Sequence, residues 1–243
     1  MKKDYDQDIA DYTQIIQQNP NDSKVYYKRG NAYYGKGDYD QAIEDFTQTI
    51  RLDPNDVDAF NYRCYAYLCK ADYDKAIEDC NQVIELDPNN TEAYNDRGIA
   101  YFMKNDYDRA IEEYSKAIRL APNDAFGYIN RGDAYDMKND YDRAIEDYTQ
   151  AIRLDPNDAE VYNERGLAFY MKDDYDQAIA DYTKALQLNP NDAEVYNYRG
   201  DAYYMKEEYE RGIADYTQAL HLDPNNAEYK QNLKDAQQKQ EEG

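Results

Sequence analysis

The stretch Ala159–Asp192, AEVYNERGLAFYMKDDYDQAIADYTKALQLNPND, is the best-formed copy of a unit that recurs through the 243-residue chain. The other copies align with it without an insertion, and the seven prolines of the chain lie 34 residues apart. A fixed period of about 20 to 50 residues is the signature of a repeat protein, in which each unit packs against its neighbours. The prolines that mark the period are Pro20, Pro54, Pro88, Pro122, Pro156, Pro190 and Pro224.

Each unit contains two segments with helical spacing. In the first full unit, Tyr26, Gly30 and Tyr33 lie at i, i+4 and i+7, which places them on one face of a helix. The second segment, residues 39–50, repeats this spacing after the polar break Lys-Gly-Asp at residues 36–38. The pattern predicts two antiparallel helices per unit, joined by short turns.

The expected helix starts also follow the period. The second helices begin after an aspartate, which suits the positive end of a helix, at Asp38, Asp72, Asp106, Asp140 and Asp174. Several first helices are expected to begin with a capping box, in which an asparagine is followed three residues later by a glutamate. The expected cap residues are Asn89, Asn157 and Asn191, with Asn225 starting the last helix.

The organisation predicted from this period is a single all-α domain over residues 1–243. Residues 1–22 match the second half of a unit, residues 23–226 form six full units, and residues 227–243 form a terminal helix with a polar outer face. Such an array has one continuous core and no internal domain boundary.

The order in which large, glycine, aromatic, alanine and proline residues follow one another in these units resembles the pattern of the tetratricopeptide repeat (TPR) family. In the fifth unit the family's positions are filled by Tyr162, Gly166, Phe169, Ala178, Tyr182 and Pro190. The resemblance covers nearly the whole chain. It implies a right-handed superhelical solenoid of helix pairs, with a concave groove, lined mainly by the first helices, that binds a peptide or protein segment.

The charge and composition of the chain limit the classes of binding partner that it can have. The formal net charge is −23, spread through the repeats, so the chain should repel nucleic acid and favour basic or neutral partners. Most of the 30 tyrosines recur on the helix faces that must be buried, which favours core packing over stacking on bases. No stretch has the length and apolarity of a membrane span and the start has no apolar leader, so we expect a cytoplasmic protein without membrane attachment.

Catalysis, cofactors and metal sites are not expected. Cys64, Cys69 and Cys80 have no Cys-x-x-Cys spacing, and Cys64 and Cys80 take places filled by glycine and an aromatic residue in other units. The one histidine, His221, occupies a place held elsewhere by exposed charged residues. The Asp-Tyr-Asp triplets lack the spacing of a calcium loop, and helix capping accounts for them better.

A charged row recurs at a position where the TPR family often has leucine. An arginine precedes the glycine position in all six full units, and an acid recurs at one place of each second helix. We predict a ladder of partly buried ion pairs between these rows, since a buried guanidinium needs such a partner. The alternative is that both rows are solvated. The arginines are Arg29, Arg63, Arg97, Arg131, Arg165 and Arg199, and the acids are Asp45, Asp79, Glu113, Asp147, Asp181 and Asp215.

The groove positions are inferred from the first-helix faces that packing leaves over. One row is rich in asparagine, a poor interior helix former, whose amides could bond a peptide backbone. Two neighbouring rows mix apolar and acidic residues. The residues predicted to line the groove are Asn61, Asn95, Ile99, Phe102, Phe126, Ile129, Asp133, Asp136, Asn163, Leu167, Tyr170 and Asn197.

The fourth unit departs most from the pattern. Phe126 replaces an acid and Ile129 replaces an asparagine, so two apolar side chains stand at normally polar places. With Asp133 and Asp136 further along the same helix, they suit a segment carrying an apolar side chain beside a Lys or Arg. Local repacking inside the unit is the alternative interpretation.

Some family members grip a carboxylate terminus with basic residues, but here the corresponding places hold acids such as Asp96, Glu160 and Glu164. We therefore predict a non-catalytic scaffold or adaptor that binds a basic or apolar-basic protein segment. The alternative is a self-assembly module that forms homo-oligomers through its terminal helices or groove.

Overall fold

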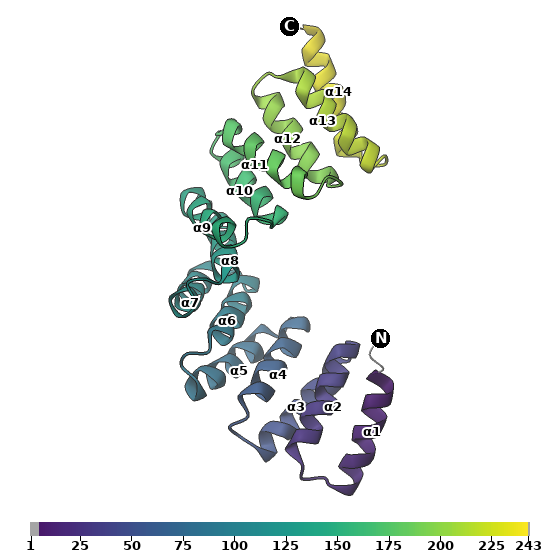
Figure 1. The fold of residues 1–243 in the computed structure, drawn as a ribbon, viewed down its shortest axis with the longest axis vertical. Helices are drawn as coiled ribbons and strands as arrows, with labels where there is room; N and C mark the ends of the chain where they lie inside the picture. Colours follow the sequence, from purple (N-terminus) through teal and green to yellow (C-terminus); the bar gives the residue numbers. More distant parts are fainter. Residues whose placement is uncertain (1–4, 243) are drawn as a thin grey trace. The chain divides into compact units, whose positions relative to one another are not determined.

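The computed structural model describes residues 5–242, and over this range it consists of fourteen α-helices and the turns between them (Figure 1). The predicted all-α fold of antiparallel helix pairs is confirmed. The chain divides into two compact units, residues 1–122 and residues 123–243. A single continuous array over the whole chain stays a prediction.

Unit 1 begins with the lone helix of the half-repeat and continues with three helix pairs. We call the first helix of each pair the A helix and the second the B helix. The helices of unit 1 are α1 (Tyr5–Gln18), α2 (Ser23–Lys36), α3 (Tyr39–Leu52), α4 (Val57–Cys69), α5 (Tyr73–Leu86), α6 (Thr91–Met103) and α7 (Tyr107–Leu120).

Unit 2 contains three further pairs and the terminal helix. Its helices are α8 (Ala125–Asp136), α9 (Tyr141–Leu154), α10 (Ala159–Met171), α11 (Tyr175–Leu188), α12 (Ala193–Met205), α13 (Tyr209–Leu222) and α14 (Ala227–Glu242). Within each unit every helix packs on the next, and A helices of neighbouring repeats also touch, as in α4 with α6 and α10 with α12. The A helices are therefore the elements that share one surface within each unit.

In five of the six full repeats the core contains a close contact between the A-helix glycine and a B-helix ring. A Cβ on Gly98 would lie 2.5 Å from the Tyr114 ring, which is 1% exposed, so only glycine leaves room for that ring. In the second repeat Cys64 and Cys80 replace this pair, and both are free and buried with their sulfur atoms 2.9 Å apart. A thiol on each helix takes the volume that a ring facing glycine takes elsewhere.

The expected A-helix caps are wrong by one residue. Asn90, not Asn89, accepts a hydrogen bond from the Ala93 backbone N–H at 2.9 Å. The Asn89 N–H donates to the Asp87 carboxylate and belongs to the turn, so the helix begins one residue later. The same shift places the observed caps at Asp158, Asp192 and Asn226.

The turn between the A and B helices uses a left-handed residue at one repeated place. Gly37 has φ of 87°, as suits a residue without a Cβ. The equivalent residues of the other repeats also have positive φ although they carry side chains, which costs about 1 kcal/mol or more per residue. They are Ala71 (57°), Asn105 (59°), Asn139 (58°), Asp173 (60°) and Glu207 (62°).

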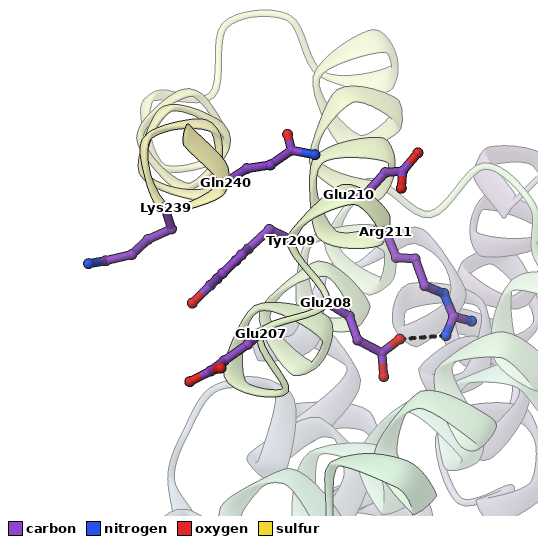
Figure 2. Close-up of a pocket in the computed structure, with 7 residues that line it drawn as sticks. All are labelled: Glu207, Glu208, Tyr209, Glu210, Arg211, Lys239 and Gln240. Atoms are coloured by element: carbon purple, nitrogen blue, oxygen red, sulfur yellow. Dashed lines mark hydrogen bonds and ion pairs between the residues drawn. The ribbon is translucent and has the colours of Figure 1, made fainter. Parts of the chain in front are cut away.

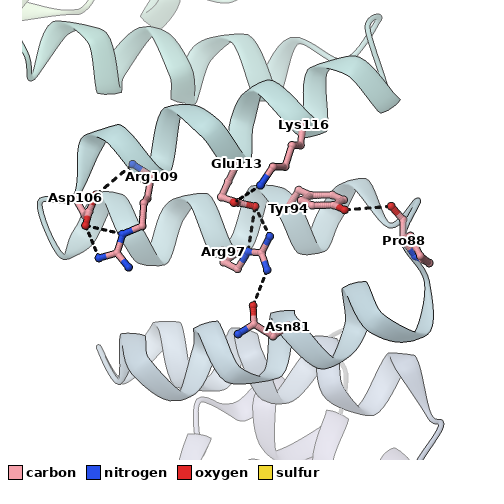
Figure 3. Close-up of polar contacts among 8 residues, drawn as sticks. All are labelled: Asn81, Pro88, Tyr94, Arg97, Asp106, Arg109, Glu113 and Lys116. Carbon is pink, nitrogen blue, oxygen red and sulfur yellow. Dashed lines mark hydrogen bonds and ion pairs between the residues drawn. The ribbon is translucent and has the colours of Figure 1, made fainter.

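The predicted arginine–acid ladder is confirmed in all six repeats. Figure 3 shows one member, in which Arg97 of α6 donates through Nε and Nη2 to Glu113 of α7, at 3.0 and 2.5 Å. The ladder acids are buried, with side-chain exposures of 4–9%, and the arginines are 14–21% exposed. The pairs are Arg29–Asp45, Arg63–Asp79, Arg97–Glu113, Arg131–Asp147, Arg165–Asp181 and Arg199–Asp215.

Within each unit, ladder arginines also donate to the helix that precedes their repeat. Arg165 Nη1 donates to the Thr149 hydroxyl at 2.9 Å, and Thr149 lies on the B helix of the preceding repeat. The guanidinium carbon lies 5.7 Å from the Tyr162 ring centre and 5.9 Å from that of Phe169, within cation–π range. One side chain thus joins three helices, a role that leucine at this place could not fill.

Candidate functional site

The residues predicted to line the groove lie on A helices of both units, and we describe each unit's A-helix surface separately. Unit 1 has the surface formed by α2, α4 and α6, and unit 2 has the surface formed by α8, α10 and α12. Four of the twelve predicted residues belong to unit 1 and eight to unit 2.

The asparagine row is far more buried than a free groove surface would be. Asn61, Asn95 and Asn197 are 7%, 4% and 1% exposed, and Asn163 is partly buried. Binding of a peptide backbone by this row stays a prediction, and it requires neighbouring side chains to give access.

At the end of unit 2 the next helix already occupies the row. Asn232 of α14 donates through Nδ2 to Asn197 Oδ1 at 3.0 Å and to Asp201 Oδ1 at 3.3 Å. Asp201 also accepts a hydrogen bond from the Tyr216 hydroxyl at 2.7 Å. The Asn197–Asp201 pair is therefore a set of acceptors that is satisfied by donors from two other helices.

The acidic side chains of α8 and α10 form a cluster in unit 2. Burial raises the pKa of Asp133 to about 6, even though the Tyr148 hydroxyl donates to it at 2.8 Å. Burial also raises the pKa of Asp136. For Glu164, burial and then the charge of Asp133 raise the pKa to about 7. The fold thus brings the predicted groove residues Asp133 and Asp136 within electrostatic reach of Glu164. The sequence marks Glu164 only as an acid at a place where some family members bind a carboxylate with a basic residue.

The apolar positions of unit 2 differ in how they are exposed. Phe126 is 46% exposed, so its ring is open to solvent, whereas Ile129 packs against the core cluster around Tyr148. Leu167 and Tyr170 are partly buried against the core cluster around Tyr182. Phe126 is the most accessible apolar anchor among these four.

Leu167 has a consequence for the tyrosine behind it. The Tyr148 hydroxyl donates to Asp133, and the Tyr216 hydroxyl donates to Asp201. In both pairs the aspartate lies fifteen residues before the tyrosine. The residue fifteen positions before Tyr182 is Leu167, which cannot accept a hydrogen bond through its side chain. The Tyr182 hydroxyl accordingly has no hydrogen-bond partner, although the side chain is 0% exposed.

Unit 1 contains a second buried acid on its A-helix surface. Asp96 of α6 is 5% exposed, and burial followed by the charge of Glu92 raises its pKa to about 8. The Tyr65 hydroxyl of α4 donates to Glu92, and burial followed by the charge of Asp96 raises the pKa of Tyr65. The predicted residues Ile99 and Phe102 lie on the same helix and are partly buried, with the Phe102 ring 5.4 Å from that of Tyr107.

The residues that sequence reasoning did not assign to a site are Asp96, Glu164 and Tyr182. A signal for the two acids exists, because Glu-x-x-Asn followed by an acid occurs twice, as EAYND at residues 92–96 and EVYNE at residues 160–164. The isolation of the Tyr182 hydroxyl follows from an intra-repeat contact that no local pattern reveals.

Two cavities in unit 2 differ in charge. Figure 2 shows the cavity of 480 Å³ between the start of α13 and the end of α14, where Arg211 pairs with Glu208 and Lys239 is also present. The cavity of 430 Å³ between α10 and α12 is lined by acids and amides, with no Lys or Arg among its lining residues. The second cavity therefore has acids and no lining cation, whereas Arg211 and Lys239 offset part of the charge of the three glutamates that line the first.

Other kinds of site find little support within residues 5–242. No cluster of His, Cys, Asp or Glu there is arranged to hold a metal ion. His221 is exposed on α13. Among the described helices, none combines the length and apolarity needed to cross a bilayer.

Comparisons with known proteins agree with the repeat boundaries. The family described as "Tetratricopeptide repeat" matches residues 23–56, 57–90, 91–124, 159–192 and 193–226. These five stretches skip the fourth repeat, which is covered by matches to related TPR families at residues 113–146 and 132–173. No curated protein matches the chain by sequence.

Solved structures share the fold over most of the chain. MamA is 31% identical over 71% of this chain and 94% of that one, with a TM-score of 0.64. The C-terminal part of a TPR repeat-containing protein from Cytophaga hutchinsonii is 22% identical over 94% of each chain, with a TM-score of 0.79. YrrB, described as a TPR protein with an unusual peptide-binding site, is 20% identical over 74% of this chain and 93% of its own, with a TM-score of 0.65. The 34-residue period, the helix pairs and these matches together show that the chain belongs to the tetratricopeptide repeat family.

Proposed function

We propose that this chain is a non-catalytic binding module whose A-helix surfaces hold a protein segment carrying basic and apolar side chains. The observation that carries the proposal is the charge of the unit 2 surface. Its A helices carry the exposed Glu160 and the partly buried Asp133, Asp136 and Glu164. The three arginines of these helices are each bonded to a ladder acid.

The charge arrangement favours a basic partner for a physical reason. Carboxylates gathered on one surface repel each other, and a cationic partner relieves that repulsion while it also speeds association. Phe126 adds an exposed apolar ring beside the acidic rows. Family membership supports the same class of function, since TPR proteins bind protein partners, and the YrrB structure is described as having a peptide-binding site.

The test is a screen of the purified chain against a random dodecapeptide library. Selected peptides are then measured by isothermal titration calorimetry on the wild type and on Phe126→Ala. We expect peptides that combine a Lys or Arg with an apolar residue, and a loss of about tenfold in affinity for the variant because the ring contributes buried area. Ile129 is a poor choice for this test, because its contact with the core would confound binding with stability.

Self-assembly is the second candidate, and one observation favours it. Helix α1 has no buried residue, and Ile15 on it is 42% exposed. Light scattering over a hundredfold range of concentration separates the candidates. A monomer that binds peptides supports the module, whereas a concentration-dependent multiple of 28.6 kDa with no peptide bound would favour assembly.

A further inference from the structure

The cavity of 430 Å³ between α10 and α12 collects carboxylates from two neighbouring A helices. Glu160 and Glu164 come from α10, and Asp192 and Glu194 come from the start of α12. Asp158 and Asp192 already cap their helices through backbone N–H groups, so their charges are partly offset. Glu160, Glu164 and Glu194 are the lining acids that no helix cap uses.

Among the described residues, the charges that act most on Glu164 are negative, and no Lys or Arg lines its cavity. The titratable groups that act on it are Asp133 and Asp136 of α8, and Glu160 of its own helix. Three phenols also feel its charge, Tyr148 of α9, Tyr182 of α11 and Tyr198 of α12. By contrast, Asp147, Asp181 and Asp215 of the same unit are buried and each has its own arginine. The fold therefore compensates its ladder acids and leaves Glu164 uncompensated.

Polar atoms beside Glu164 are also without partners. Asn163 donates through Nδ2 to Glu164 Oε1 at 3.4 Å, and its Oδ1 is buried with no hydrogen bond. The completely buried Tyr182 hydroxyl, which lies within electrostatic reach of Glu164, has no hydrogen bond either. A buried acceptor without a donor costs roughly 1–3 kcal/mol, so such groups call for an explanation. For Asn163, which lines the cavity, a donor from outside the chain would supply one.

The same arrangement recurs independently in unit 1. Glu92, Asn95 and Asp96 of α6 repeat the spacing of Glu160, Asn163 and Glu164. Asn95 and Asp96 are 4% and 5% exposed, and Asn95 Oδ1 and Asp96 Oδ2 both lack a hydrogen bond. A buried amide oxygen without a donor thus accompanies this sequence element both times it occurs, and in unit 1 a carboxylate oxygen of Asp96 also lacks one.

Asn232 shows what satisfies such acceptors within this fold. It occupies the place in α14 that Glu164 occupies in α10, and its amide donates to the acceptor pair Asn197 and Asp201. A neutral amide is enough there. Around Glu164 the acceptors carry net negative charge, so the matching donor is a cation. A lysine ammonium offers three donors and an arginine guanidinium five.

We propose that the Glu160–Asn163–Glu164 element and its cavity form a socket for one Lys or Arg side chain of a bound protein segment. The inference rests on the proposed function and specifies the side chain that one site on the unit 2 surface selects. The cation would bond Asn163 Oδ1 and lie between the Glu160 and Glu164 carboxylates. The equivalent element of α6, which Tyr65 partly covers, would be a second socket of the same kind.

The test uses a small probe that does not depend on peptide binding. N-acetyl-lysine-N′-methylamide is titrated to 20 mM into the ¹⁵N-labelled full chain, and the Asn163 side-chain amide and the backbone amides of residues 160–164 are followed by NMR. The matched probe is the same compound acetylated on Nε, which has the same backbone but no charge. We expect saturable shifts with the cationic probe and none with the neutral one.

Variants then assign the effect to the socket. Glu164→Gln keeps the side-chain shape and should weaken the cationic probe about tenfold, because a charge-assisted contact is lost. Glu146→Gln, an exposed acid on α9, changes net charge equally and should leave the affinity within about twofold. Circular dichroism confirms that both variants are folded.

The outcomes separate the socket from the function on which it rests. If residues 160–164 do not shift with the cationic probe, or shift equally with the neutral one, the socket is refuted even where library peptides bind. If the lysine probe binds as expected while no library peptide does, the socket stands and the proposed peptide-binding function fails. Equal losses in Glu164→Gln and Glu146→Gln would reduce the effect to overall charge and refute the socket.

Discussion

Removing one arginine of the ladder should destabilise the fold by far more than removing an exposed ion pair. Arg165 makes two bonds of 2.7 Å to Asp181 and one of 2.9 Å to Thr149, and the two charged side chains are 17% and 9% exposed. In Arg165→Met the Asp181 carboxylate stays buried without its partner. Breaking a buried pair costs about 3–5 kcal/mol, and residual solvent contact at Arg165 places the expected loss near the lower limit, about 3 kcal/mol.

The assay is urea unfolding followed by circular dichroism, with midpoints and slopes compared because a repeat array can unfold in more than one step. Lys172→Met is the matched control, since it removes a cation from the exposed pair with Asp142, whose side chain is 77% exposed. An exposed pair contributes about 0–1 kcal/mol.

A second variant isolates the cause. In Arg165→Met with Asp181→Leu no charge is left buried, so most of the lost stability should return. Arg165→Lys should lie between the wild type and Arg165→Met, because an ammonium cannot make the forked contact. If Arg165→Met costs no more than Lys172→Met, or the double variant is no more stable than Arg165→Met, the pair is effectively solvated and our reading of the ladder is refuted.

Three further predictions test the core, the turns and the buried acids. Cys80→Tyr should lower the free energy of unfolding by about 2 kcal/mol, because the new ring would meet Cys64. Adding Cys64→Gly should restore most of the lost stability in thermal unfolding. A double variant less stable than Cys80→Tyr would contradict this packing argument. Ala71→Gly should raise the free energy of unfolding by about 0.5–1 kcal/mol and Gly37→Ala should lower it, since both residues have positive φ; changes of the same sign in urea melts would contradict the conformational argument. Burial and the charge of Glu92 raise the folded-state pKa of Asp96 to about 8, so its contribution is fully present below its unfolded pKa of about 4 and is lost as pH rises to 8. Urea melts should therefore show a free energy of unfolding that is lower at pH 8 than at pH 5, by on the order of 3–4 kcal/mol, and a flatter profile in Asp96→Asn. An unchanged profile in that variant would show that Asp96 is not the source.

The fourth repeat illustrates how sequence and comparison agree on an exception. Phe126 and Ile129 stand where other repeats have an acid and an asparagine, which made this repeat unusual in the sequence. The family model that matches the other five repeats does not match this one. Its A helix is also the shortest of the six, with 12 residues against 13 or 14 in the others. The structure then separates the two apolar residues, since Phe126 is exposed while Ile129 contacts the core.

The sequence by itself determined the helix pairs and the repeat boundaries, and it predicted the arginine ladder with solvated rows as the alternative. These depend on spacing within one repeat, and a 34-residue period repeats each local arrangement, so the pairing of Arg29 with Asp45 predicts that of Arg199 with Asp215. Family membership follows from the same spacing.

Only the tertiary structure decided which polar groups are buried and which of them have partners. The asparagines of the predicted groove row share one sequence position, yet Asn197 receives a donor from α14 while the Asn95 and Asn163 oxygens receive none. The difference arises because each A-helix side chain meets residues of the neighbouring repeat, and those residues vary from one repeat to the next. Burial and charge compensation are properties of that contact, so a pattern within one repeat cannot reveal them.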